Sequence, residues 1–352
     1  MGRRHGSPLT ILPFAMMALV AAVDLSAGPG VGYLPLLSLG PAFASLAGGV
    51  RRTAWVGLFA IALCAGLARH DEIIGTRAGD ATFISVVGVT AAGMLAAAYR
   101  ERNERELADV RTIAEVAQRV LLRPMPRRVG PVRAAVRYLS ASARARIGGD
   151  LYEVVMTSRG VRVIVGDVQG KGLDAVETAA VVLGAFREAA YDEPGLPEVA
   201  DRIERALARQ LTSEQFVTGV LAELDSGGRL TLLNRGHPPP LLVRAGHPVR
   251  PLDPPEPAPP LGLSGLVEEA AAPFSVGFAP GDQVLFYTDG VVEARNDRGV
   301  FYPLAERADL LVGADPETAL DALQADLLRY AGKPLDDDAA MLMLTTEPSI
   351  TA

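Results

Sequence analysis

The sequence predicts an α+β protein in which an all-α membrane module of four helices precedes a soluble α+β sandwich. Residues 8–99 of the 352-residue chain are nearly all apolar or small, which is typical of a membrane bundle. Beyond residue 124, strand-like and helix-like segments alternate and include two consecutive helices, which favours a sandwich over a doubly wound sheet. We therefore expect a membrane module at 1–99, a connector helix at 100–123, a soluble domain at 124–347 and a tail at 348–352.

Four stretches reach the length of a membrane span, roughly residues 8–27, 31–50, 53–69 and 81–99. Basic residues flank them at the N-terminus, at Arg51–Arg52 and after residue 99, whereas the loop at 70–80 is acidic. The positive-inside rule then predicts a multi-pass protein of the cell (inner or plasma) membrane, with the soluble domain and both termini in the cytoplasm. A cleaved signal peptide is the alternative for the first stretch, but three more stretches follow it and no convincing cleavage site ends it.

The connector at 100–123 is predicted to be a helix that ends before Pro124. Apolar residues repeat along it at helical spacing among charged ones, namely Leu107, Val110, Ala114, Ala117 and Leu121. About three heptads are too few to decide between a dimerising coiled coil that relays a signal and an amphipathic linker packed on the next domain. Both alternatives stay open from the sequence.

Charge and cysteine content narrow the function classes. The chain carries a net charge of −7, and residues 1–123 are net basic, so the soluble domain is strongly acidic and nucleic-acid binding is not expected. The lone cysteine, Cys64, rules out a disulfide framework. One cysteine and four histidines also supply a zinc or iron site poorly.

The soluble domain is predicted to contain elements in the following order. Strands at 132–142 and 161–168 precede two helices at 177–193 and 197–211. A hairpin follows, with strands at 216–225 and 229–236 around Ser226-Gly227-Gly228, and then a strand at 240–246. The proline-rich segment 251–260 is expected to be a surface loop. The chain then continues with a strand at 283–294, a helix at 316–332 closed by Gly332, and a last strand at 339–347.

Four acidic motifs carry the candidate chemistry: GGD at 148–150, GDVQGKG at 166–172, YTDG at 287–290 and DDD at 336–338. Each places an Asp at the edge of an apolar run, and carboxylate oxygens are the ligands that Mg²⁺ and Mn²⁺ prefer. Each motif alone could be a capped turn or a solvated acidic loop. Together they predict a shared site for two divalent cations, because adjacent carboxylates repel one another without a counter-ion.

The ordered motifs ARIGGDLYEV, GDVQGKGLDAV, FVTGVLAELD, NRGHPPPLLV, YTDGVVEARN and DDDAAMLML resemble the SpoIIE-type serine/threonine phosphatases of bacteria. These RsbU-like enzymes are a branch of the metal-dependent PPM, or type 2C-like, phosphatases. The resemblance spans about 112–346 and implies two antiparallel β-sheets that face each other, with helices outside.

The resemblance also implies roles for individual residues. Two Mn²⁺ or Mg²⁺ ions would be held by Asp150, Asp167, Asp289, Asp337 and the backbone carbonyl of Val168. The four aspartates would act in catalysis through a metal-activated water, without a protein nucleophile. Secondary candidates for phosphate contact are Arg146, Lys171, Gly170 and Asp338, although Arg144 and Arg146 could simply pair with acidic neighbours.

Four further positions bear on this interpretation. Glu153 stands where the family often has Asp, and Ala340 stands where it commonly has Thr, so second-shell support for Asp337 could be weaker. His237, in NRGHPPPLL, could be a general acid, but a structural tie with Asn234 is the favoured interpretation. His247 is expected in an exposed turn.

The expected protein is a membrane-anchored phosphoserine/phosphothreonine phosphatase, with a homodimer formed through the connector. By resemblance, its substrate would be a phosphorylated anti-anti-sigma (STAS-domain) protein in a sigma-factor partner-switching pathway. A catalytically degenerate membrane scaffold that sequesters the partner is one alternative. A diguanylate cyclase is another, since such proteins also use a GGD hairpin, but it would leave TDG and DDD unexplained.

Overall fold

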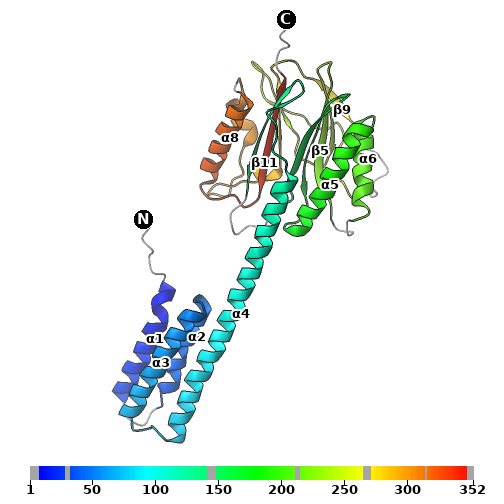
Figure 1. Ribbon diagram of the computed structural model, residues 1–352. Helices are drawn as coiled ribbons and strands as arrows, with labels where there is room; N and C mark the ends of the chain where they lie inside the picture. Colours follow the sequence, from blue (N-terminus) through cyan, green and yellow to red (C-terminus); the bar gives the residue numbers. More distant parts are fainter. Residues whose placement is uncertain are drawn as a thin grey trace. The chain divides into compact units, whose positions relative to one another are not determined.

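The computed structural model describes residues 8–27, 32–140, 148–210, 215–264, 271–313 and 315–346. The chain divides into two compact units, Met1–Asp109 and Val110–Ala352. We describe each unit by itself (Figure 1).

The first unit is all helical. Its elements are α1 (Pro8–Ala27), the 3-10 helix η1 (Leu34–Ser38), α2 (Leu39–Ala47), α3 (Val50–His70) and the first part of α4 (Arg77–Leu121). Its core includes Met17, Leu37, Val56, Ala60 and Cys64.

Two helices of the described residues, Val50–His70 and the Arg77–Glu106 part of α4, are long and apolar enough to cross a membrane. Two such helices are weak evidence for a membrane, so the predicted four-span topology is not confirmed. The predicted span at 31–50 is not one helix. Gly48 and Gly49 both take extended backbone angles, which ends α2 after nine residues. Even together with η1, which directly precedes α2, the apolar helical stretch Leu34–Leu46 is too short to count among the candidate spans.

The second unit contains two antiparallel sheets. One has the order β1-β2-β11-β10-β7-β8, and the other has the order β3-β4-β5-β6-β9. The strands are β1 (Arg128–Val129), β2 (Val132–Leu139), β3 (Leu151–Thr157), β4 (Gly160–Val168), β5 (Val217–Leu224), β6 (Arg229–Arg235), β7 (Leu241–Val243), β8 (Arg250–Pro251), β9 (Phe274–Gly277), β10 (Gln283–Tyr287) and β11 (Ala339–Thr346). The expected pair of antiparallel sheets is therefore present.

Successive side chains of each strand point to opposite faces of its sheet, and this produces three apolar layers. Val163 and Val165 of β4 pack with Phe286 and other residues between the sheets, whereas the intervening Ile164 packs toward the helices. This is the period of two expected of a strand that is buried on both faces. Helices α5 (Leu173–Asp192) and α6 (Leu196–Leu207) cover one sheet, and α8 (Pro316–Ala331) covers the other (Figure 1).

Several predicted boundaries move. The predicted strand at 283–294 ends at Tyr287, and Asp289–Val292 forms the short helix α7. Helix α5 begins directly after Gly172, earlier than predicted. The predicted end of α8 is confirmed, since Gly332 takes the left-handed conformation with φ 63° that glycine adopts without strain.

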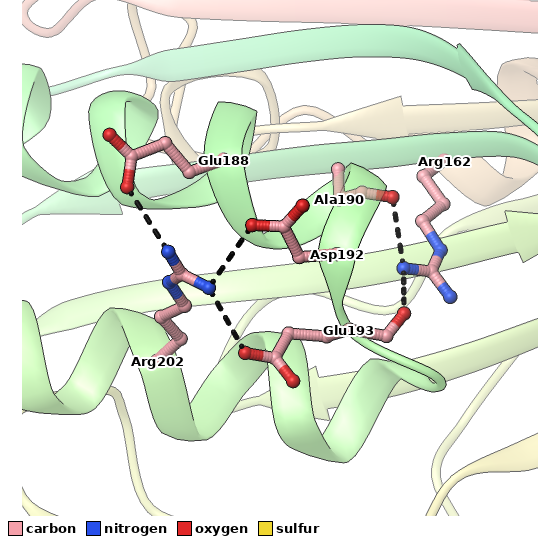
Figure 2. A network of polar contacts seen from close by, with 6 residues as sticks. All are labelled: Arg162, Glu188, Ala190, Asp192, Glu193 and Arg202. Atoms are coloured by element: carbon pink, nitrogen blue, oxygen red, sulfur yellow. Dashed lines mark hydrogen bonds and ion pairs between the residues drawn. The ribbon is translucent and has the colours of Figure 1, made fainter.

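Arg162 fixes the C-terminal end of α5 to the sheet (Figure 2). This side chain of β4 is fully buried and donates from Nε to Glu223 at 2.6 Å. Its Nη1 donates to the carbonyls of Ala190 at 3.0 Å and Glu193 at 2.8 Å. Arg202 of α6 adds ion pairs to Glu188, Asp192 and Glu193 at 3.3–3.4 Å. The network holds α5 and α6 against each other and against β4.

Candidate active site

The four acidic motifs meet because the strands that carry them end at one side of the sandwich. Asp150 directly precedes β3 and Asp167 lies next to the end of β4, both in the five-stranded sheet. Asp289 follows β10 and Asp337 precedes β11, both in the six-stranded sheet. Each sheet therefore contributes two carboxylates.

A cavity of about 240 Å³ lies where the motifs meet. Its described lining includes three of the predicted ligand carboxylates and the backbone of the glycine-rich turn. The lining residues are Gly148, Gly149, Asp167, Val168, Gln169, Gly170, Lys171, Phe216, Thr218, Asp289 and Asp337. Asp150 is not among them; it is 3% exposed and interacts electrostatically with Asp167 and Asp289.

Burial and mutual repulsion disfavour the ionised form of these carboxyls. Burial, followed by the charge of Asp167, raises the pKa of Asp150 well above its usual range. Burial, with the charges of Asp289 and Asp337, raises the pKa of Asp167 to about 7. Burial also raises the pKa of Asp289, with contributions from Glu293 and Asp337. The cavity thus concentrates negative charge that a cation would stabilise.

The donor set fits hard divalent cations. Among the described residues, no three His, Cys, Asp or Glu side chains are grouped so that they could hold an ion as they stand, so binding would require these side chains to move. The backbones of the GGD loop and of the end of β4 already lie close together. The Val168 amide donates to the Gly149 carbonyl at 3.2 Å, and a Cβ on Gly149 would lie 2.6 Å from the Val168 oxygen. Only glycine at 149 allows the GGD loop to approach the end of β4 in this way.

Thr288 is a site residue that the sequence analysis missed. Its fully buried hydroxyl donates to Asp150 Oδ2 at 2.9 Å and accepts from the Ala340 amide at 2.9 Å. It therefore holds the Asp150 carboxylate and also joins YTDG to the strand that follows DDD. Its position directly before Asp289 was the only signal in the sequence. Ala340 itself lies in the apolar layer between the sheets.

Asp338 does not line the cavity, although it was a candidate for phosphate contact. It is 2% exposed, and its Oδ2 accepts from the Tyr138 hydroxyl at 2.5 Å and from the Gly148 amide at 2.9 Å. Asp338 thus anchors the GGD loop to the DDD motif. Among the other secondary candidates, Lys171 and Gly170 line the cavity, and Arg144 and Arg146 lie outside the described residues.

The structural interpretation of His237 is confirmed. The Asn234 side chain donates to the His237 carbonyl at 2.8 Å and accepts from its amide at 2.9 Å. The buried imidazole contacts the Tyr287 carbonyl through Nε2 and the Thr218 hydroxyl through Nδ1, both at 3.1 Å. Burial lowers the pKa of His237 to about 4, so the neutral ring donates from Nε2 and accepts at Nδ1.

Two other expected positions are also structural. Glu153 accepts from Arg187 at 2.7 Å, and the second nitrogen of this guanidinium donates to the Leu121 carbonyl at 3.0 Å. Glu153 therefore connects β3, α5 and the end of α4. His247 lies in an exposed turn, as predicted.

The model of the Stage II sporulation protein E (SpoIIE) family matches residues 157–347, which is more than half of the chain. The chain belongs to the SpoIIE family. The matched range contains Asp167, Asp289 and Asp337 but begins after Asp150, whose place in the site rests on the geometry above. Membership in a phosphatase family excludes the diguanylate cyclase alternative.

The chain is also similar to solved structures. The chain is similar to the RsbU and RsbW domains of Rv1364c from Mycobacterium tuberculosis, with 29% identity and a TM-score of 0.51 over 61% of each chain. It thus spans less than two thirds of that protein. It is similar to the SiaA-PP2C domain of Pseudomonas aeruginosa, with 19% identity and a TM-score of 0.58 over 70% of this chain and 99% of that one. It is also similar to the PP2C phosphatase domain and a regulatory-domain fragment of SpoIIE from Bacillus subtilis, with 17% identity and a TM-score of 0.53 over 62% of this chain and 64% of that one. The last two likenesses show the PP2C fold.

Proposed function

We propose that this SpoIIE-family chain is an Mn²⁺- or Mg²⁺-dependent phosphoserine/phosphothreonine protein phosphatase. The observation that carries the proposal is the convergence of four separate motifs, two from each sheet, around one acidic cavity. Its volume of about 240 Å³ is below the range of pockets for drug-sized ligands. A phosphorylated side chain suits such a space.

Bound divalent ions would supply an activated water and neutralise charge on the phosphoryl group. The chain's own residues have the remaining tasks. Asp150, Asp167, Asp289 and Asp337 would hold the ions, together with the Val168 carbonyl. Thr288 keeps Asp150 oriented through its 2.9 Å hydrogen bond. The Thr218 hydroxyl contacts Nδ1 of the buried His237 at 3.1 Å.

The test is phosphate release by the full-length chain in detergent micelles, from p-nitrophenyl phosphate and from a phosphoserine STAS-domain protein, with and without Mn²⁺. We expect Mn²⁺-dependent release that Asp167→Asn and Asp289→Asn abolish. Asp201→Asn, on the exposed face of α6, is the matched control and should leave release unchanged. Folded protein that binds Mn²⁺ but releases no phosphate would favour the sequestering scaffold.

We also propose that the chain is membrane-anchored and dephosphorylates a STAS-domain partner. The two long apolar helices of the first unit support the anchor. The RsbU and RsbW domains that occur together in the similar mycobacterial protein support a partner-switching role. Co-sedimentation of the full-length chain with membranes after a carbonate wash tests the anchor, and recovery in the soluble fraction would refute it.

The end of α4 supports a dimer through a different face from the predicted one. Ala117 and Leu121 pack against Val176 of α5, as expected of a linker docked on the next domain; the side chains of Leu107, Val110 and Ala114 lie outside those described. Ile113, Val116 and Val120 are 60%, 55% and 73% exposed, at the three- and four-residue spacing of a coiled-coil seam. We propose that this exposed stripe pairs with a second copy of the chain. Val116→Glu should convert the dimer to a monomer in light scattering.

A signal carried by α4 would have a contact path to the site. The buried Gln118 amide donates to the Tyr138 hydroxyl at 2.7 Å and to the Gly148 carbonyl at 3.2 Å. Tyr138 in turn donates to Asp338. We propose that movement of α4 reaches the GGD and DDD motifs through these bonds.

A further inference from the structure

Lys171 is the one cationic side chain among the described residues that line the site cavity. Its Nζ lies 2.7 Å from Asp337 Oδ2. Its charge also lowers the pKa of Asp167 and of Asp289, against the larger effects that raise them. The ammonium group therefore acts on three of the four carboxylates predicted to bind metal.

The backbone around Lys171 is shaped by two glycines. Gly170 and Gly172 have φ of 105° and 90°, and a Cβ on either would meet no atom within 4 Å. Glycine is therefore favoured at both positions by the positive φ angle and not by crowding, because a side chain there would meet no neighbouring atom. The turn places Lys171 in the cavity lining, in contact with Asp337 before β11.

The Lys171–Asp337 ion pair is exposed enough for a divalent ion to replace the lysine. The side chains of Lys171 and Asp337 are 36% and 41% exposed, so water reaches both, and exposed ion pairs contribute little net stability. The Asp337 oxygen that Lys171 contacts belongs to a carboxylate needed for divalent ions, so the ammonium and an ion compete for it. Once displaced, a lysine on a flexible four-carbon stem can reach phosphoryl oxygens in the same cavity.

On the basis of the function proposed above, we propose that Lys171 holds Asp337 and the substrate phosphoryl group in turn. It first competes with divalent ions for the Asp337 carboxylate, and then donates to the phosphoryl oxygens of the bound phosphoserine or phosphothreonine. Metal binding and phosphate binding are thereby coupled through one side chain.

The experiment uses the full-length chain in detergent micelles. Mn²⁺ binding is measured by the electron paramagnetic resonance signal of the free ion, and inorganic phosphate binding to the Mn²⁺-loaded protein is measured by calorimetry. In Lys171→Gln, we expect Mn²⁺ to bind about two- to fivefold tighter, because a competing cation is gone. Phosphate should bind about tenfold more weakly, because a charged donor is gone. Lys171→Arg should recover most of the phosphate affinity.

The chain supplies a matched control, since Lys333 is its only other lysine and pairs with Asp336 of the same DDD motif at 2.8 Å. Lys333 does not line the cavity, so Lys333→Gln should change neither affinity. Unchanged phosphate affinity in Lys171→Gln, or weaker Mn²⁺ binding, would overturn the proposal. Phosphate release from a phosphoserine protein is followed on the same samples. Absence of release by a wild-type chain that binds both ligands would refute the proposed function, while the two affinities still decide the role of Lys171.

Discussion

Replacement of Thr288 by Val removes one hydroxyl from the centre of the site and leaves the shape of the side chain unchanged. Thr288 is fully buried, so water cannot replace the lost bonds. The Ala340 amide loses its acceptor, and an unpaired buried donor costs about 1–3 kcal/mol. For a domain of this size, a loss of about 2 kcal/mol lowers the melting temperature by about 4–8 °C.

The second effect of Thr288→Val is on metal affinity. The hydroxyl donates to Asp150 Oδ2 at 2.9 Å and thereby lowers the pKa of Asp150 against burial. Without it, the pKa of Asp150 rises further, and more of the carboxyl is protonated at neutral pH. Loss of a residue that orients a metal ligand typically lowers metal affinity by about 10- to 100-fold. We expect that range for Mn²⁺ at pH 7, with partial recovery at higher pH.

The assay is titration of the full-length chain with Mn²⁺ at several pH values between 6.5 and 8.5, alongside thermal unfolding. Thr231→Val is the control, because its hydroxyl contacts Ser275 at 2.9 Å at an exposed position far from the four acidic motifs in the sequence. Thr288→Val protein that is folded and binds Mn²⁺ with wild-type affinity would refute the reasoning. A loss of affinity that is equal at every pH would refute the part that depends on the protonation of Asp150.

Three further predictions follow from the same contacts. Arg162→Met should destabilise the second unit by about 3 kcal/mol, because it leaves Glu223 and the carbonyls of Ala190, Glu193 and Pro194 without their donor. Arg202→Met on the surface should cost less than about 1 kcal/mol, and equal losses in urea unfolding would contradict this. Because the pKa of Asp167 is raised to about 7, the metal-free fold binds protons that the unfolded chain has released, so its melting temperature should fall between about pH 4 and pH 7. Saturating Mn²⁺ should remove that fall, and a metal-free melting temperature that rises over this interval would oppose the assignment. Gln118→Leu should change the rate of phosphate release, and an unaltered rate would argue against control through α4.

The site was more predictable from the sequence than its supports were. An apolar strand that ends at an Asp and a Gly is a local signal, and Asp167 and Asp289 both follow that pattern. Thr288 and Gln118 give no such signal. Their partners, Asp150 and Gly148, are 138 and 30 residues away in the chain, so only the tertiary fold makes them site residues.

The helices and strands also differ in how well the sequence predicted them. Buried strands such as β4 and β11 were found because both of their faces are apolar. β1, β8 and β9 were not predicted because they have only two to four residues each, at the edges of their sheets. The seven-residue edge strand β3 was also missed. The expected span at 31–50 is not confirmed as one helix, because the chain begins there with the 3-10 helix η1 before α2 and ends α2 at Gly48 and Gly49.

The hydrogen bonds around Gly148 join the end of α4 to the site more directly than packing alone would. Gly148 offers its carbonyl to Gln118 and its amide to Asp338, and a Cβ at this position would lie 3.1 Å from the Asp338 carboxylate. Because Gly148 belongs to the GGD motif and Asp338 to the DDD motif, a shift of Gln118 must either break a buried hydrogen bond or move both motifs. An unpaired buried partner costs about 1–3 kcal/mol, which corresponds to a change of about 5- to 150-fold in the equilibrium between two arrangements of the site. A rotation of α4 could therefore set how readily Asp150 and Asp337 hold the divalent ions of the proposed site.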